Sequence, residues 1–154
     1  MSEPTVVCSI GVMAYNEERN IGNLLKALCA QQLDTVAIGE IVVVASGCTD
    51  NTCGVVEGEI QCDPRIRLLV QQEREGKMSA INLFLKNARY EVVVIINADV
   101  LPEEYCIEQL VGPFADRDYF YHHYGDLQRG RAADTYPAAG YLPGLYVNVG
   151  HGAR

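Results

Sequence analysis

Four short runs of apolar residues, rich in β-branched side chains, recur along the first two thirds of the chain. They lie at 6–13, 41–44, 66–70 and 92–96. The runs are mostly apolar at consecutive positions rather than alternate ones, which indicates strands buried on both faces. Strands of this kind form parallel sheets that helices cover on either side. The pattern therefore predicts an α/β fold with a mostly parallel sheet and helices on both faces.

Segments with helical spacing separate these strands. We expect Asn16 to cap a first helix, whose apolar positions fall at i, i+3, i+4 and i+7. Those positions are Ile21, Leu24, Leu25 and Leu28. A short second helix is expected after the turn at 46–50, and Gly76 opens a third whose apolar face holds Ile81, Phe84, Leu85 and Ala88. Pro102 suits the first turn of a fourth helix.

Polar residues gather directly after the predicted strands. Four clusters occupy 15–17, 46–50, 73–77 and 97–99. Because open α/β sheets bind ligands at the carboxyl ends of their strands, we expect these clusters to meet at one edge of the sheet. The functional interpretation depends on this convergence.

Three common phosphate-binding schemes do not fit these clusters. The turn after the first strand, 13–17, lacks the glycines of a dinucleotide fingerprint. A P-loop would need glycine where Gln71 precedes the Gly76-Lys77 pair. A phosphorelay receiver would need an acidic pair after the first strand, which is missing. What remains is Asp99, preceded by Asn97, because a carboxylate there can hold a hard divalent cation. The alternative is that Asp99 only caps the helix that contains Pro102.

Composition narrows the range of partners. The formal net charge is −8 and the pI is near 4.8, so general binding to nucleic acid is disfavoured. No apolar run is long enough for a transmembrane segment, and we expect no signal peptide ahead of the first strand. The six cysteines lack the spacing of zinc or redox pairs, which favours reduced thiols in a cytoplasmic protein.

Four segments, taken together and in order, resemble family 2 glycosyltransferases of the GT-A fold. They are 12–21, 42–52, 75–82 and 96–102, and the resemblance extends over about residues 5–115. It implies a Rossmann-like, truncated nucleotide-binding half that binds a nucleoside-diphosphate sugar with Mn²⁺ or Mg²⁺ and transfers the sugar. The resemblance identifies neither the sugar nor the acceptor.

The resemblance also implies roles for individual positions. The base and ribose pocket would be lined by Ala14, Tyr15, Glu17 and Ser46. Lys77 would offset the charge of the diphosphate, and Asp99 would bind the metal with Asn97 beside it. The catalytic base stays unassigned, because in the family it lies beyond the metal motif.

Two departures from the family pattern affect these roles. Ala45-Ser46 stands where the family often has an acidic pair that contacts the base, so nucleotide selection is expected to be weaker or altered. Asn97 replaces the first aspartate of the metal motif, so metal affinity is expected to depend on Asp99 and the nucleotide phosphates.

The amino-acid composition changes near Asp118, because six of the nine tyrosines and all three histidines follow that residue. We therefore expect a partial nucleotide-sugar domain at 1–118 and an unrelated or poorly ordered tail at 119–154. In this tail, the segments 129–131, 136–137 and 142–154 resemble the C-terminal piece of FAD-dependent amino-acid-oxidase-type enzymes that modify tRNA. Its flavin fingerprint is absent, and the alternative is a strand and loop that complete the sheet.

Three hypotheses follow. The leading one is the donor-binding half of a glycosyltransferase. The second is a non-catalytic nucleotide- or partner-binding remnant of a truncated or fused gene, and the third is a fragment of an FAD-dependent oxidoreductase. Exposed sheet edges would also favour a homo-dimer.

Overall fold

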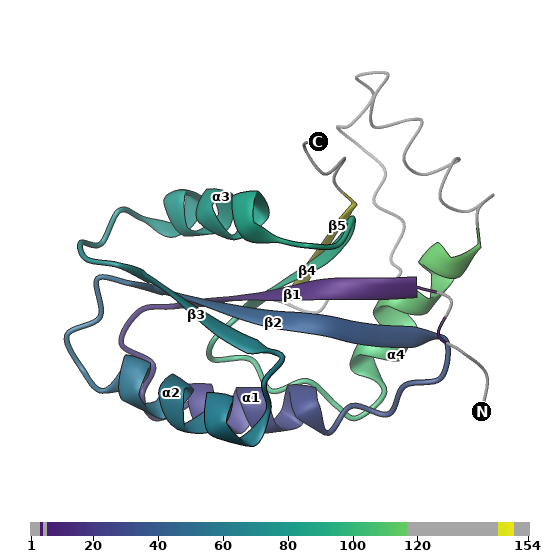
Figure 1. Cartoon of the computed structure of the whole chain (residues 1–154), viewed down its shortest axis with the longest axis horizontal. Helices are drawn as coiled ribbons and strands as arrows, with labels where there is room; N and C mark the ends of the chain where they lie inside the picture. Colours follow the sequence, from purple (N-terminus) through teal and green to yellow (C-terminus); the bar gives the residue numbers. More distant parts are fainter. Residues whose placement is uncertain (1–3, 5, 117–144, 150–154) are drawn as a thin grey trace.

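The computed structural model describes residues 4, 6–116 and 145–149 (Figure 1). Strands and helices alternate through residues 6–116, as the apolar pattern predicted. The strands are β1 (Val6–Ala14), β2 (Val36–Ser46), β3 (Ile66–Gln71), β4 (Val92–Asn97) and β5 (Leu145–Val149). The helices are α1 (Ile21–Cys29), α2 (Thr52–Cys62), α3 (Lys77–Asn87), α4 (Cys106–Val111) and the 3₁₀ helix η1 (Gly112–Ala115).

One sheet holds all five strands in the order β3-β2-β1-β4-β5. The first four are parallel, and β5 runs antiparallel to β4 with Val149 opposite Val92. The predicted α/β class with a mostly parallel sheet is therefore confirmed. The expected division at residue 118 stays a prediction, because apart from β5 the segment 119–154 lies outside the described residues.

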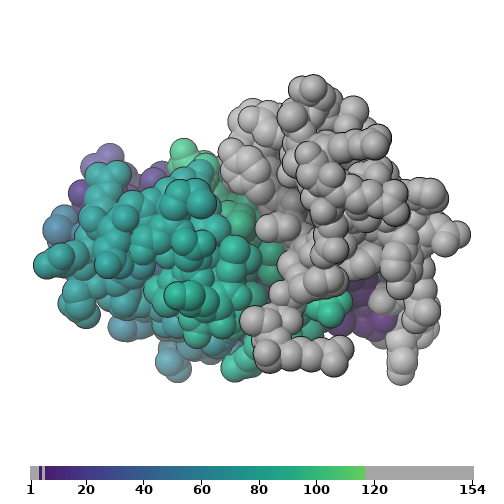
Figure 2. Space-filling view, turned by 90° about the horizontal axis from the view of Figure 1, so that it is seen from above, coloured from purple at the N-terminus to yellow at the C-terminus, as the bar shows by residue number. Residues whose placement is uncertain are grey.

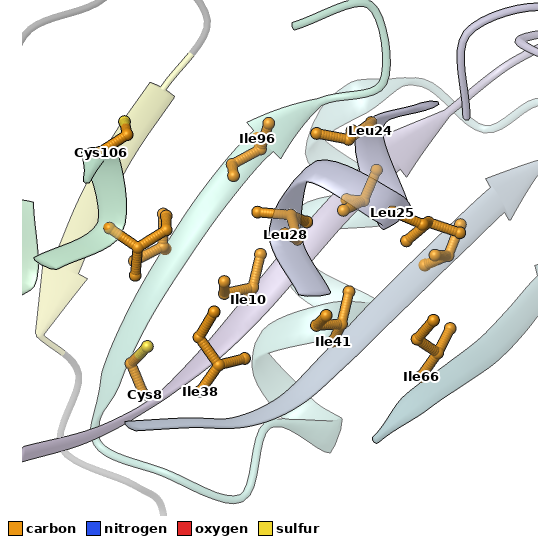
Figure 3. Packing of buried hydrophobic residues seen from close by; sticks show 14 of the residues in the cluster. Cys8, Ile10, Leu24, Leu25, Leu28, Ile38, Ile41, Ile66, Ile96 and Cys106 are labelled. Atoms are coloured by element: carbon orange, nitrogen blue, oxygen red, sulfur yellow. The ribbon is translucent and has the colours of Figure 1, made fainter. Parts of the chain in front are cut away.

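Helices α1, α2 and α4 cover one face of the sheet, and α3 covers the other (Figure 1). On the first face, leucines of α1 lie against isoleucines of neighbouring strands, as Figure 3 shows for Leu24, Leu25 and Leu28. All four apolar positions expected in this helix are buried. Burial of such side chains stabilises a fold by about 1.5–3 kcal/mol each, so this layer anchors the sheet.

The α3 face depends on a close approach between Phe84 and β1. A Cβ at Gly11 would lie 2.5 Å from the Phe84 ring, so only glycine leaves room for it. Ala80 and Phe84 are the buried residues of α3, whereas Leu85 is exposed. Three of the four residues predicted for the apolar face of this helix therefore pack on the sheet, because Ile81 and Ala88 lie partly buried against the same cluster as Phe84. Only Leu85 was wrong, and the predicted start at Gly76 was right. Seen from above in Figure 2, much of this surface belongs to the β3–α3 part of the chain (teal).

Two other local predictions were wrong. Asn16 does not cap α1, which begins at Ile21 after Asn20; instead it adopts a positive φ of 49° and bonds to the turn after β2. Pro102 is not in the first turn of a helix, because α4 begins only at Cys106. Asparagine and proline both occur in turns as well as at helix starts, which is why the pattern did not separate the two.

The strand β2 begins earlier than its apolar run indicated. Gly39 and Glu40 interrupt that run, yet both lie within the strand. Glu40 is 2% exposed because Ser9 and Arg67 bond to its carboxylate, so a charged residue occupies a core position. Within the described part of the chain, no helix combines the length and apolar character that crossing a bilayer requires.

All six cysteines carry free thiols, in line with the expectation from their spacing. Cys8 and Cys106 are buried, whereas Cys29 and Cys62 are exposed. Burial raises the pKa of the Cys8 thiol to about 12, so this side chain acts as a small apolar residue of the core.

Candidate functional site

A cavity of about 350 Å³ opens at the carboxyl edge of the sheet, on the side covered by α3. The four polar clusters that follow β1, β2, β3 and β4 all contribute to its walls, so the expected convergence occurs. The lining includes every site residue predicted from the sequence: Ala14, Tyr15, Glu17, Ser46, Lys77, Asn97 and Asp99. It also includes Arg74, which was not predicted individually.

Hydrogen bonds join the loop after β1 to the turn after β2. The Asn16 side-chain oxygen accepts from the backbone N–H of Thr49 at 2.8 Å and of Asp50 at 3.3 Å. The Glu17 N–H donates to the Thr52 hydroxyl at 2.9 Å. Burial tends to raise the pKa of Asp50, but bonds from the Thr52 hydroxyl and backbone outweigh it and hold that pKa below its usual range. This wall of the cavity is thus held in place without any ligand.

The turn after β2 also fixes the loop that leads into α3. Gly47 has a φ of +59°, and its N–H donates to the carbonyl of Gln71 at 2.9 Å. A Cβ on Gly47 would lie 2.4 Å from the backbone nitrogen of Arg74. The close contact sets where Arg74 and the following residues enter the cavity wall.

The amino end of α3 faces the cavity through Gly76 and Lys77. Gly76 precedes the helix with a φ of +92°, and no side chain caps the first turn. The first N–H groups of a helix and its dipole favour an anion. Together with the Lys77 ammonium, they make this wall suited to phosphate.

Ser46 ends β2 at the base of the cavity and is 6% exposed. Its hydroxyl has no hydrogen-bond partner among the described residues. A buried polar atom left unpaired is costly, so this hydroxyl is a ready contact for a polar ligand atom.

Asp99 lies on the tight turn after β4. The N–H of Ala98 donates to the carbonyl of Met13 at 3.3 Å, and that of Val100 donates to the carbonyl of Asn97 at 3.1 Å. These bonds fix the turn, while Asp99 itself stays exposed. Its side chain does not cap α4, which begins seven positions later after Tyr105. The capping alternative for Asp99 is therefore wrong.

The donors at this turn fit a hard divalent cation. Asp99 offers a carboxylate and Asn97 an amide oxygen, and both line the cavity. Among the described residues, no group of three His, Cys, Asp or Glu side chains could hold a metal. A cation at Asp99 would therefore take most of its ligands from water or from substrate oxygens, as Mg²⁺ commonly does.

Comparison with protein families gives a match to residues 9–137, well over half of the chain, for the family described as glycosyl transferase family 2. The chain belongs to glycosyl transferase family 2. The predicted resemblance to this family is thereby confirmed; the flavin-enzyme resemblance of the tail falls on residues of which only 145–149 are described.

Relatives within family 2 share part of their length with this chain. Glycosyltransferase GlyG of Streptococcus pneumoniae is 26% identical over 110 residues, which are 71% of this chain and 36% of that protein. Dolichyl-phosphate beta-glucosyltransferase ALG5C of Trichomonas vaginalis is 31% identical over 103 residues, which are 64% of this chain and 31% of that protein. The chain thus spans about a third of the length of these relatives.

Among solved structures, the mannosyltransferase PcManGT from Pyrobaculum calidifontis, in complex with GDP-Man and Mn²⁺, is similar with a TM-score of 0.59 and 32% identity. The similarity covers 74% of this chain and 32% of that one. The predicted α/β fold of the GT-A kind is thus matched by a solved glycosyltransferase structure.

Proposed function

We propose that this chain binds a nucleoside-diphosphate sugar together with Mn²⁺ or Mg²⁺, as the donor site of a glycosyltransferase. The observation that carries the proposal is the cavity at the carboxyl edge of the sheet. There a carboxylate at Asp99, a cation at Lys77 and an unpaired hydroxyl at Ser46 come from three separate strand ends. These are the groups needed for a metal, a diphosphate and a polar base or ribose.

Each part of the donor has a suitable wall. Tyr15 and Ser46 lie where an aromatic ring and a buried hydroxyl can hold the nucleoside, with Glu17 nearby for ribose hydroxyls. Lys77 and the amino end of α3 favour the diphosphate through charge and backbone N–H groups. When bound at Asp99, the metal would supply electrostatic stabilisation of the leaving diphosphate. Lys77 would stabilise the same charge.

The similarity to PcManGT supports this proposal, since that protein was solved with GDP-Man and Mn²⁺ and is 32% identical to this chain. The similarity covers 74% of this chain. The polar sites also fit independently of that similarity: the donor set at Asp99 is oxygen-only and suits either cation.

The test is titration calorimetry with UDP- and GDP-sugars in the presence and absence of Mn²⁺. We expect Asp99→Ala to weaken Mn²⁺-dependent binding by about tenfold or more while the melting temperature stays unchanged, because the side chain is exposed. Glu57→Ala serves as a matched control, since Glu57 is an exposed carboxylate on α2 and does not line the cavity.

Two results would contradict the proposal. One is the absence of heat with every sugar nucleotide and either cation. The other is Mn²⁺-dependent affinity in Asp99→Ala equal to that of the wild type. A separate assay of nucleoside-diphosphate release then distinguishes turnover from binding alone, because a non-catalytic protein would bind donor without releasing product above background.

A further inference from the structure

The Arg74 guanidinium lies over the ring of Tyr15, with 4.0 Å between its central carbon and the ring centroid. Both residues line the cavity, and both side chains are exposed. None of the ion pairs among the described residues includes Arg74. The neighbouring Glu75 accepts instead from the Ser79 hydroxyl at 3.4 Å. An exposed arginine with an aromatic partner but no carboxylate partner is thus held at the cavity.

Arg74 is fixed at two points. Its backbone lies against Gly47, where a Cβ would meet the Arg74 nitrogen at 2.4 Å. Its side chain lies against the Tyr15 ring. Arginine normally loses much rotamer freedom when it binds a ligand, and a side chain already held in place loses less. This arrangement therefore reduces the entropic cost of a further contact made by the guanidinium.

We propose that Arg74, positioned by the Tyr15 ring, is a second cationic contact for the diphosphate of the donor, in addition to Lys77. The inference rests on the proposed function of the cavity. A guanidinium on an aromatic face keeps the N–H groups at its edge available, and that edge matches the geometry of phosphate oxygens. Tyr15 acts as a positioning residue for Arg74 as well as a wall for the nucleoside.

The negative charges of the cavity explain why a second cationic contact for the diphosphate would be needed. Glu17 and Asp99 place two carboxylates in the same cavity as the expected diphosphate. Their repulsion of the phosphates must be offset, and a metal bound at Asp99 would supply part of the positive charge. Arg74 lies on the loop after β3, next to the β1 loop that carries Glu17. A cation at Arg74 would add positive charge beside the Glu17 carboxylate.

The test uses inorganic pyrophosphate with Mn²⁺ as the probe, because it has no base to stack on Tyr15, followed by UDP and GDP. We expect Arg74→Ala to weaken pyrophosphate and both nucleotides by about tenfold, as for loss of a charge-assisted contact. Arg19→Ala is the matched control, because it removes an exposed arginine that is not part of the cavity, and its affinity should equal that of the wild type.

Tyr15 variants test the positioning role. Tyr15→Leu should weaken pyrophosphate by about threefold, whereas Tyr15→Phe should keep wild-type affinity because it keeps the ring. In the Arg74→Ala background, Tyr15→Leu should have no further effect on pyrophosphate, since the residue it positions is gone. Melting curves for each variant establish that it is folded.

The outcomes separate this inference from the proposed function. If the wild type binds neither pyrophosphate nor any nucleotide with Mn²⁺, the proposed function fails. If the wild type binds and Arg74→Ala binds equally well, only the role of Arg74 is overturned. If Tyr15→Leu weakens pyrophosphate as much in the Arg74→Ala background as alone, the positioning role of Tyr15 is overturned.

Discussion

Charged residues gather at both ends of α3, and the two groups differ in how their charges are paired. At its carboxyl end, Glu40 is 2% exposed and accepts from the Ser9 hydroxyl at 2.8 Å. It also accepts from the Arg67 guanidinium at 2.7 Å and from the Arg89 backbone N–H at 2.8 Å. Arg67 in turn donates to the carbonyl of Asn87, the last residue of α3. Here the carboxylate of Glu40 is paired with the guanidinium groups of Arg67 and Arg89.

At the amino end of α3, Arg74 and Asp99 are exposed, and no ion pair among the described residues includes either. The nearby Ser46 hydroxyl is buried without a partner. The same helix on the same sheet face thus has a network of buried, paired charges at one end, whereas the other end has the exposed charges of Arg74 and Asp99 and the unpartnered hydroxyl of Ser46. Satisfied buried charges hold strands in register, whereas unsatisfied groups that share a cavity point to a ligand.

The largest effect should come from breaking the paired end. Glu40→Ala leaves Arg67 partly buried without its carboxylate, and we expect it to lower the free energy of unfolding by about 3–5 kcal/mol. Urea denaturation measures this. Glu40→Gln should cost less, because the amide oxygen can still accept from Ser9.

A surface carboxylate that belongs to neither end of α3 supplies the control for this variant. Glu57→Ala removes an exposed carboxylate of α2 and should change stability by no more than about 0.5 kcal/mol. The fraction of Glu40→Gln that is folded should bind sugar nucleotides as the wild type does. Unchanged stability in Glu40→Ala would show that the network is not structural.

A smaller loss of stability should follow from acid, and again it concerns the paired carboxylates. Burial raises the pKa of Glu40, but bonds from the Arg89 backbone, Ser9 and Arg67 outweigh it and lower that pKa from 4.5. For Glu108, burial is likewise outweighed by backbone N–H groups of residues 34–36, so its pKa is also lowered. Carboxylates with a lowered folded-state pKa add stability above their unfolded pKa and lose it as pH falls through the folded value.

Stability should therefore be level above about pH 5 and decrease below pH 4.5, as both carboxyls become protonated. Urea midpoints measured between pH 3 and pH 7 would test this. The decrease should be shallower in Glu40→Gln, which has no carboxyl to protonate, than in the control Glu57→Gln. Equal slopes for these two variants would contradict the assigned role of Glu40.

The apolar pattern predicted the elements that pack on both faces, because consecutive β-branched residues have few other uses. It also placed the polar clusters at one edge, since parallel strands end together. Arg74 was missed as an individual residue, although its cluster at 73–77 was predicted, because its position depends on a contact with Tyr15 across 59 residues of sequence. Long-range contacts between loops leave no local pattern.

The Glu40 network was missed for a related reason. A glutamate beside an apolar run usually indicates an exposed position or the end of a strand. The residues that bond to the Glu40 carboxylate lie 27, 31 and 49 positions away in the sequence. The early start of β2 was missed for the same reason, because Glu40 interrupts the apolar run from which the strand was predicted. In contrast, Asp99 could be located from sequence, because a carboxylate directly after an apolar strand depends on neighbouring residues alone.

The smallest effect should come from Gly47, which belongs to the ligand end yet contributes to structure. Its φ of +59° costs another residue about 1–2 kcal/mol, and a Cβ would lie 2.4 Å from the Arg74 nitrogen. We expect Gly47→Ala to lower stability by about 1–2 kcal/mol and, because Arg74 must shift, to weaken pyrophosphate severalfold. Gly58→Ala is the matched control: its Cβ meets no atom within 4 Å in α2, so it should stabilise the helix by about 0.5–1 kcal/mol and leave binding unchanged. Weaker stability with wild-type pyrophosphate affinity in Gly47→Ala would mean that the position of Arg74 does not matter for binding, and the two ends of α3 would then differ less than their pairing suggests.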